Sequence, residues 1–178
     1  MIFLYFSYGS NMLSSRLIAR CPSAKLIGPA WASGYLIDFS KRGLDGSGKA
    51  SLAKGWDDAQ TPGVLYEIDM NERADLDRFE SAGVGYDRMD NFIVDANNQT
   101  VSATTYIACN PEADLVPFDW YLALIIAGAM EHKLSAGHLA KLRQVPFMVD
   151  VDLRREARLA ARDALAKHGY RDPLVLLK

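Results

Sequence analysis

The chain has 178 residues, of which 49% are hydrophobic and 24% charged, a balance typical of one globular domain with its own core. Its net charge of −2 leaves no basic surplus to attract nucleic acid or anionic lipid, so neither is expected as a partner. Cys21 and Cys109 are too few for a disulfide framework and are expected to be free thiols in a reducing compartment.

The first part of the chain is expected to be mainly β. Residues 2–7 are apolar and aromatic on both faces, which predicts a buried strand that ends in the turn at 8–11. Residues 13–20 repeat apolar side chains at helical spacing and predict a short helix. Further extended segments are expected at 24–39, with a bend at Gly28–Pro29, at 50–53, and at 64–68 after a turn at 57–63.

A second short helix and a hairpin are expected next. Asp69 and Glu72 have the spacing of a capping box, which would start a helix that ends in the loop at 81–85. Because turn residues separate two β-rich runs, a pair of strands joined at Asn97–Asn98 is predicted. These strands are expected at 86–94 and 101–108.

After Pro111 the pattern becomes helical, with helices predicted at 118–133, 135–144 and 151–167. We therefore predict an α+β fold with a helical C-terminal third, as a single domain over residues 1–178 in which 146–178 form a C-terminal helical extension. No apolar run resembles a signal peptide or is long enough to cross a bilayer, so we expect a cytoplasmic protein without membrane contact. The apolar face of the last helix is expected to comprise Leu153, Ala157, Leu159, Ala160, Ala164 and Leu165.

The turn Tyr8-Gly9-Ser10-Asn11 is the first candidate site. Amides between a strand end and a helix start lack an intrahelical acceptor, so they favour a carboxylate or a developing oxyanion. Gly9 lets the chain turn sharply and lets a ligand approach the backbone. The alternative is a simple strand-to-helix turn with Ser10 or Asn11 as the N-cap residue.

Glu80 is the second candidate. It stands at the end of a short apolar helix, and the neighbouring Phe79 and Val84 would give its carboxylate a partly apolar setting. A carboxylate in such a setting is suited to proton transfer. The alternative is a solvated glutamate in the last helical turn.

Other side chains give weaker signals. Tyr121 begins an apolar helix, where a core or interface aromatic is the alternative to a site residue. His132, His138 and His168 form no helical zinc pair, and no CxxC is present, so no metal site is expected. Nucleotide-binding motifs and the Gly-x-Ser-x-Gly elbow are also absent, and we expect no organic cofactor.

Taken together, these motifs resemble the gamma-glutamylcyclotransferase family. Residues 3–11 are similar to the N-terminal signature of that family, and 20–24 resemble the segment after its first helix. Residues 61–66 resemble its central strand, and Leu76-Asp77-x-x-Glu80 resembles the segment with its catalytic glutamate. Tyr121, ahead of Gly128–Ala129, is similar to a substrate-contacting tyrosine, and Tyr86 and Tyr106 fall where the family has tyrosines.

The resemblance implies a small mixed β-barrel flanked by helices and an enzyme of the lyase or acyltransferase class. The implied reaction cyclises a γ-glutamyl amino acid or amine to 5-oxoproline and releases the amine, without a metal, with Glu80 as general acid and base. The expected partner is this small molecule, and a homodimer is compatible with the resemblance. The implied substrate-binding residues are Tyr5, Phe6, Ser7, Tyr8, Gly9, Ser10 and Tyr121.

One departure from the family keeps alternatives open. Ser81–Ala82 follow Glu80, where the family usually has glycine. A cyclotransferase for γ-glutamylamines or for a γ-glutamyl biosynthetic intermediate would use the same chemistry with another leaving group. A non-catalytic ligand-binding homologue is a further alternative, and so is a partner-binding role for the arginine face of the last helix, which carries Arg154, Arg155, Arg158 and Arg162.

Overall fold

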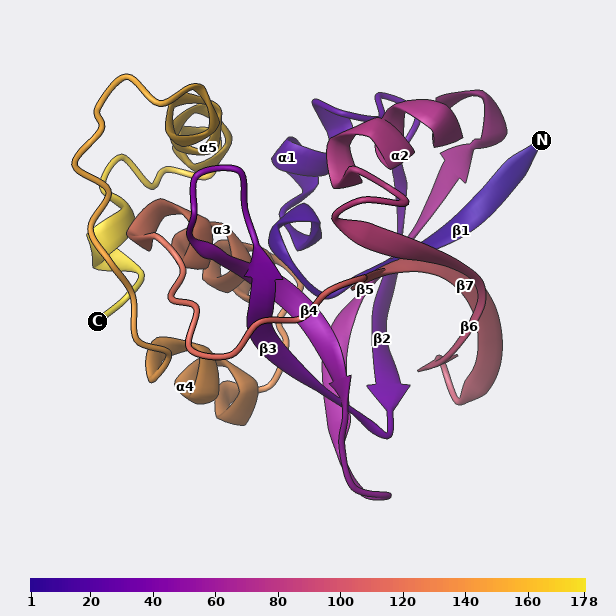
Figure 1. Ribbon diagram of the computed structural model, residues 1–178. Coiled ribbons are helices and arrows are strands. Elements are labelled where there is room, and N and C mark those ends of the chain that lie inside the picture. Colours follow the sequence, from indigo (N-terminus) through magenta and orange to yellow (C-terminus); the bar gives the residue numbers. More distant parts are fainter.

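A closed, mixed β-barrel forms the centre of the fold in the computed structural model, which describes residues 1–178 (Figure 1). The first strand pairs antiparallel with β5 on one side and parallel with β7 on the other, and this parallel contact closes the barrel. A separate two-stranded sheet, β3–β4, lies beside it. The strands in barrel order are β1 (Ile2–Ser7), β5 (Gln60–Asp69), β2 (Lys25–Ser33), β6 (Tyr86–Ala96) and β7 (Gln99–Ala108), and the outer pair is β3 (Tyr35–Arg42) and β4 (Gly48–Lys54).

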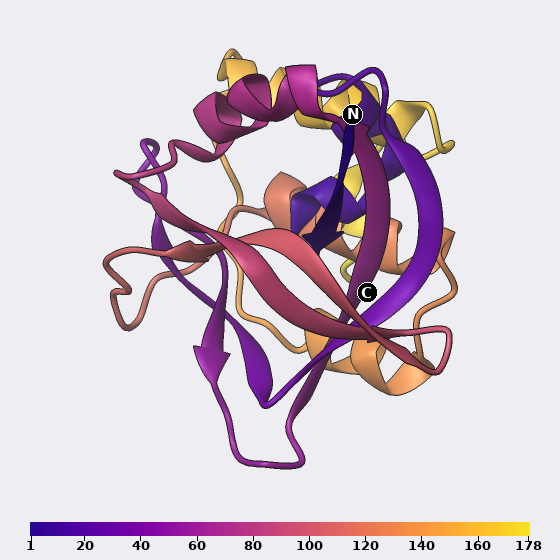
Figure 2. The same cartoon turned by 90° about the vertical axis from the view of Figure 1, so that its right-hand side faces the viewer.

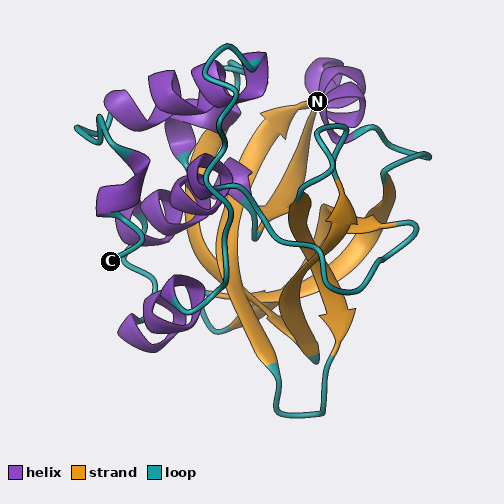
Figure 3. Cartoon of the chain, turned by 60° about the vertical axis from the view of Figure 1, so that its left-hand side comes forward, coloured by secondary structure: helices purple, strands orange, loops and turns teal.

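Most of the helices gather on one side of the strands (Figure 3). The central one is α3 (Asp119–Glu131), which is buried from Asp119 to Ala129 and packs on the 3-10 turn η1 (Ser10–Met12). No helix is both long and apolar enough to span a membrane. The remaining helices are α1 (Ser14–Ile18), α2 (Arg73–Glu80), α4 (Ala136–Arg143) and α5 (Glu156–Ala166), with 3-10 turns η2 (Met70–Glu72) and η3 (Pro173–Val175).

The second helix is set apart from this group. Figures 1 and 2 both place α2 at the end of the barrel where the N-terminus lies. Its C-terminal residue, Glu80, is followed by Ser81 in the left-handed conformation, with φ +52°, which ends the helix and turns the chain. Its last residue, Glu80, contacts Asn11 in the turn that follows β1.

The predicted barrel and hairpin are confirmed. Strand β1 occupies the predicted residues, and β6 and β7 pair through Asn97–Asn98, both of which have positive φ. Two successive residues with positive φ form the tight turn that matches the twist of a hairpin, and asparagine tolerates this conformation better than other side chains. The mixed barrel with a helical C-terminal third is the fold that the family resemblance implied.

Two local predictions are wrong. The segment at 24–39 divides at Gly34, with φ +77°, whereas near Gly28–Pro29 there is only a bulge, between Leu26 and Gly28 of β2. The capping box is half formed: the Asp69 side chain accepts from the Asn71 amide, but Glu72 turns away and accepts from Ser23. Glu72 makes three contacts with the backbone and hydroxyl of Ser23, which is a better set of partners than one amide at the helix start.

The last helix begins at Glu156 and not at Val151 as predicted. Asp150 and Asp152 each accept a hydrogen bond from the backbone two residues on, and Arg155 pairs with Asp150 at 2.7 Å. Such side-chain bonds give the backbone an alternative to the helix. The predicted apolar face is correspondingly incomplete, because Ala164 and Leu165 are buried while Leu153, Ala157, Leu159 and Ala160 are exposed.

Gly128 in α3 allows the close approach of η1 and generates a stability prediction. A Cβ at this position would stand 2.6 Å from the Leu13 amide nitrogen and 2.7 Å from Met12 Cβ. We expect Gly128→Ala to lower the free energy of unfolding by about 1–3 kcal/mol, although alanine is the better helix former. The matched control is Gly137→Ala in α4, where a Cβ meets nothing within 4 Å, and a gain of about 0.5–1 kcal/mol is expected. Urea unfolding of both variants checks this, and a Gly128→Ala protein as stable as wild type would contradict it.

Candidate active site

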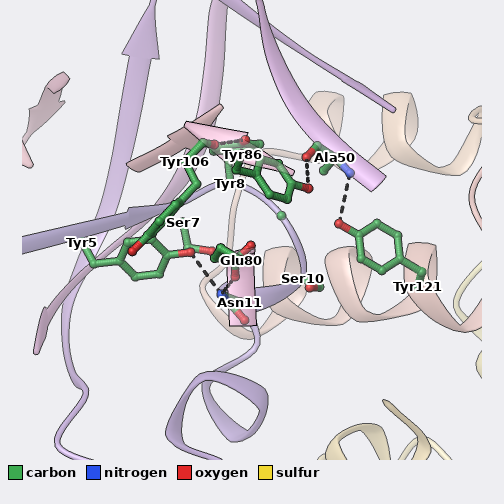
Figure 4. A pocket seen from close by; sticks show the side chains of 11 residues that line it. Tyr5, Ser7, Tyr8, Ser10, Asn11, Ala50, Glu80, Tyr86, Tyr106 and Tyr121 are labelled. Carbon is green, nitrogen blue, oxygen red and sulfur yellow. Dashed lines mark hydrogen bonds between the residues drawn. The ribbon is translucent and has the colours of Figure 1, made fainter. Parts of the chain in front are cut away.

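A small cavity of about 30 Å³ lies where β1 ends, and seven elements contribute to its wall (Figure 4). We call it the inner cavity. Apart from tyrosines, Glu80 is the one ionisable residue in its wall, and no lysine or arginine lines it. The lining residues are Tyr5, Ser7, Tyr8, Gly9, Ser10, Asn11, Ala50, Glu80, Tyr86, Tyr106 and Tyr121.

The turn between β1 and η1 presents free backbone donors. The amides of Gly9, Ser10 and Asn11 donate no hydrogen bond within the protein. The Ser7 hydroxyl, also in the wall, is buried without a partner. Since unpaired buried donors are costly, such a group of them is expected where a ligand supplies acceptors. The alternative of a simple capped turn is not what forms, because neither the Gly9 position nor the Leu13 position has a side-chain cap.

Glu80 is held through one oxygen and leaves the other free. Its Oε1 accepts from Asn11 Nδ2 at 2.8 Å and from Arg20 Nη1 at 3.1 Å, while Oε2 accepts no hydrogen bond. The side chain is 15% exposed. Two donors on one oxygen fix the plane of the carboxylate, so Oε2 is the oxygen available to a ligand.

Asn11 joins the parts of this arrangement. Its amide group donates to Glu80 and to the Tyr5 hydroxyl, and its Oδ1 accepts from Arg20 Nη1 at 3.0 Å. Arg20 stacks on Phe79 at 5.0 Å, on the outer side. Phe79 is 49% exposed and Val84 81%, so they do not form the apolar setting predicted for Glu80. The polar network of Asn11 and Arg20 takes that place.

Tyrosine hydroxyls supply further donors. The Tyr121 hydroxyl accepts from the Ala50 amide at 3.0 Å, and the Tyr5 hydroxyl accepts from Asn11, so each keeps its own proton for another acceptor. Tyr86 donates to the Ala50 carbonyl at 2.8 Å, which ties β6 to β4. Burial, with the Glu80 charge as a further cause, raises the pKa of all five cavity tyrosines: Tyr5, Tyr8, Tyr86, Tyr106 and Tyr121.

Among the eight predicted site residues, Phe6 alone does not line the inner cavity. Side chains alternate along a strand, so Tyr5 and Ser7 face the cavity and Phe6 faces the barrel core. Its ring stacks on Phe92 with 6.2 Å between centroids, and its carbonyl accepts from Thr105. The structure brings together Glu80, Tyr5, Ser7, Tyr8, Gly9, Ser10 and Tyr121.

Sequence reasoning missed three contributors. Asn11 belongs to the candidate turn, but the sequence assigned its side chain no role beyond a helix cap, whereas in the structure this side chain contacts the carboxylate. Arg20 begins a segment that resembles the family, but nothing local predicts its contact with Glu80, which is 60 positions away in the sequence. Ala50 takes part through its backbone, for which side-chain identity carries no signal.

A larger chamber of about 470 Å³ opens beside the inner cavity, and we call it the outer chamber. Ser10, Glu80, Tyr86 and Tyr121 line both, so the two are adjacent. The charged residues of the outer chamber are Arg16, Arg20, Lys41, Asp45, Lys49, Glu80, Arg155 and Glu156. No group of three His, Cys, Asp or Glu side chains is arranged to hold a metal ion.

The barrel and its buried cavity place the chain in the class of gamma-glutamyl cyclotransferase folds. A solved structure described as a gamma-glutamyl cyclotransferase superposes with a TM-score of 0.82 at 23% identity, covering 94% of this chain and 99% of that one. Residues 61–142 match the model of the AIG2-like family. Gamma-glutamylcyclotransferase of Homo sapiens is 26% identical over 154 residues, which is 80% of this chain and 78% of the human one, and the Bos taurus protein is 25% identical over the same shares. The chain therefore has the gamma-glutamyl cyclotransferase fold and is similar in sequence to gamma-glutamylcyclotransferases over four-fifths of its length.

The raised pKa values of the cavity tyrosines predict how stability depends on pH. A tyrosine in the unfolded chain ionises at about pH 10, whereas the buried cavity tyrosines keep their protons to higher pH. The stabilisation is therefore complete below about pH 10 and is lost as pH rises above it, because only the unfolded state releases the protons. Tyrosinate absorbance and far-ultraviolet circular dichroism, recorded on one sample during alkaline titration, should change together for these residues. Ionisation of most tyrosines while the dichroism stayed native would contradict this.

Proposed function

We propose that the protein is a cyclotransferase that converts a γ-glutamyl amino acid or amine to 5-oxoproline and free amine, with Glu80 as general acid and base. Similarity to gamma-glutamylcyclotransferases in sequence and in fold supports the reaction class. The observation that carries the proposal for this chain is a cavity that combines one half-free carboxylate with several unpaired donors.

This combination matches the glutamyl end of such a substrate. The α-carboxylate and the γ-carbonyl are acceptors, and they require the donors that the turn amides, Ser7, Tyr5 and Tyr121 offer. The α-ammonium group is a donor and requires an acceptor, which Glu80 Oε2 offers. A site with many donors and one free acceptor therefore suits an α-amino acid group better than a neutral or cationic ligand.

The first step removes a proton. The α-ammonium group passes it to Glu80, and the free amine attacks the γ-carbonyl carbon to close a five-membered ring. Because both groups belong to one molecule, the main task of the site is to hold the folded substrate, and well-oriented intramolecular reactions reach effective molarities on the order of 10⁵ M. The oxyanion that develops on the γ-oxygen is stabilised by the unpaired donors of the turn.

The second step breaks the bond to the leaving nitrogen. The tetrahedral intermediate collapses, the bond between the γ-carbon and the leaving nitrogen breaks, and this nitrogen takes the proton that Glu80 holds. The ring nitrogen, which became cationic on attack, gives its second proton to the freed Glu80 carboxylate, which passes it to the departing amine. The products are 5-oxoproline and the amine, and Glu80 returns to the carboxylate form. No water and no redox partner enters the balance.

The same chemistry serves γ-glutamylamines and γ-glutamyl-protected intermediates, which differ only in the leaving group. The Ser81–Ala82 departure that kept a non-catalytic homologue open leaves Glu80 in the cavity wall, since Ser81 turns the chain immediately after it. This observation favours the enzyme over the binding module.

Replacement of Glu80 tests the proposed base. Glu80→Gln keeps the shape and the acceptor for Asn11 and Arg20 but cannot take a proton, so we expect kcat to fall roughly 10²- to 10⁴-fold with the fold intact. Glu112→Gln, at an exposed glutamate that lines neither the inner cavity nor the outer chamber, is the control and should retain wild-type turnover. Mass spectrometry of 5-oxoproline provides the measurement. A Glu80→Gln protein with most of its activity would sink the assignment.

Arg20 is expected to act as a positioning residue for Glu80. Arg20→Gln removes one of the two donors on Oε1, and we expect kcat to fall about 10-fold or more while KM changes little, since small misplacements cost rate more than binding. Arg20→Lys retains a cation and should restore part of the loss. A change confined to KM, or no rescue by lysine, would argue against this role.

A further inference from the structure

Two cations in the outer chamber lack an acidic partner. Arg20 pairs with Glu80, Lys49 with Asp45, and Arg155 with Asp150. Arg16 and Lys41 form no ion pair at all. Both are half-buried, where an uncompensated charge is more costly than on the open surface.

Arg16 is the more constrained of the two. Its Nε donates to the Ser10 hydroxyl at 3.1 Å, which orients the guanidinium at the boundary between the inner cavity and the outer chamber. Its terminal nitrogens donate no hydrogen bond inside the protein and are not buried, so they are open to a ligand. Burial and the nearby Arg20 charge lower the pKa of Arg16 to about 9, which still leaves it a cation at neutral pH.

The one unpaired acid of the chamber does not offset this cation. Glu156 is exposed, and the charged groups that act on Arg16 are Arg20, Tyr121 and Glu80. Arg20, in the turn that follows α1, adds a second positive charge near Arg16. Lys41 is held over the Tyr86 ring at 5.2 Å, on the wall that both spaces share.

We propose that Arg16, assisted by Lys41, binds an anionic group on the leaving amine and so makes the enzyme select γ-glutamyl amino acids over γ-glutamylamines. This inference rests on the proposed function and adds the residues that decide its specificity. The inner cavity takes the glutamyl end, because its donors and Glu80 match that end, and the leaving group then lies in the outer chamber. A carboxylate there meets the two free guanidinium nitrogens in the fork geometry that arginine offers to carboxylates.

The test compares two substrates that differ by one carboxylate, γ-glutamylalanine and γ-glutamylethylamine. For the wild type we expect kcat/KM for γ-glutamylalanine to exceed that for γ-glutamylethylamine by about 10- to 100-fold, the range of one charge-assisted contact. In Arg16→Gln this ratio should fall close to one, in Lys41→Gln it should fall less, and in Arg16→Lys it should keep an intermediate value. Arg162→Gln, on the exposed face of α5, is the matched control and should retain the wild-type ratio.

The outcomes separate the inference from the function beneath it. Equal turnover of both substrates by the wild type overturns the specificity inference and leaves the proposed function standing. Because this comparison uses the wild type alone, it does not depend on whether the variants fold. An equal loss on both substrates in Arg16→Gln also overturns it, because Arg16 would then serve the glutamyl end. No 5-oxoproline from any γ-glutamyl compound with folded wild-type protein overturns the proposed function and this inference with it.

Discussion

The contact of Glu80 Oε1 with Asn11 and Arg20 is the interaction on which the rest of the site depends, because it joins two segments that lie far apart in the chain. The turn after β1 supplies Asn11, the turn after α1 supplies Arg20, and the end of α2 supplies the carboxylate. A carboxylate with one oxygen saturated and the other free has one direction in which it can exchange a proton. The barrel and α3 hold the turn in place, and the close contact at Gly128 shows how little space separates them.

The charge distribution around this contact divides the site into two parts with different tasks. The inner cavity has neutral donors and one carboxylate, so it suits a group that is itself a zwitterion. The outer chamber has a surplus of cations, two of them unpaired, so it suits an anion. A γ-glutamyl amino acid has this order of groups along its length, with the zwitterionic glutamyl end first and the second carboxylate on the leaving side. The two parts share a wall at Ser10, Tyr86 and Tyr121, where the bond to be broken would lie.

Local signals predicted the barrel strands and the turn, because apolar runs and glycine act over a few residues, whereas the choice of Glu80 came from the family resemblance. The remainder depends on contacts between distant segments. The partners of Glu80 lie 60 and 69 positions away, so no local pattern predicts that they contact it. Ala50 contributes only its backbone, so its residue type does not predict its role. Successive side chains of β1 point to opposite faces, so Tyr5 and Ser7 line the cavity and Phe6 does not. The start of α5 differs from the prediction because Asp150 and Asp152 accept hydrogen bonds from backbone amides two residues on, which replaces the first helical turn.

The most direct test of the account is the fate of the γ-carbonyl when a γ-glutamyl amino acid is turned over in water labelled with heavy oxygen. Direct attack by the substrate amine excludes water, so the account predicts 5-oxoproline without solvent oxygen, together with one equivalent of the free amino acid. Glutamate that carries the labelled oxygen in its γ-carboxylate would mean that water is the nucleophile. That result would contradict both the intramolecular reaction and the task assigned to Glu80.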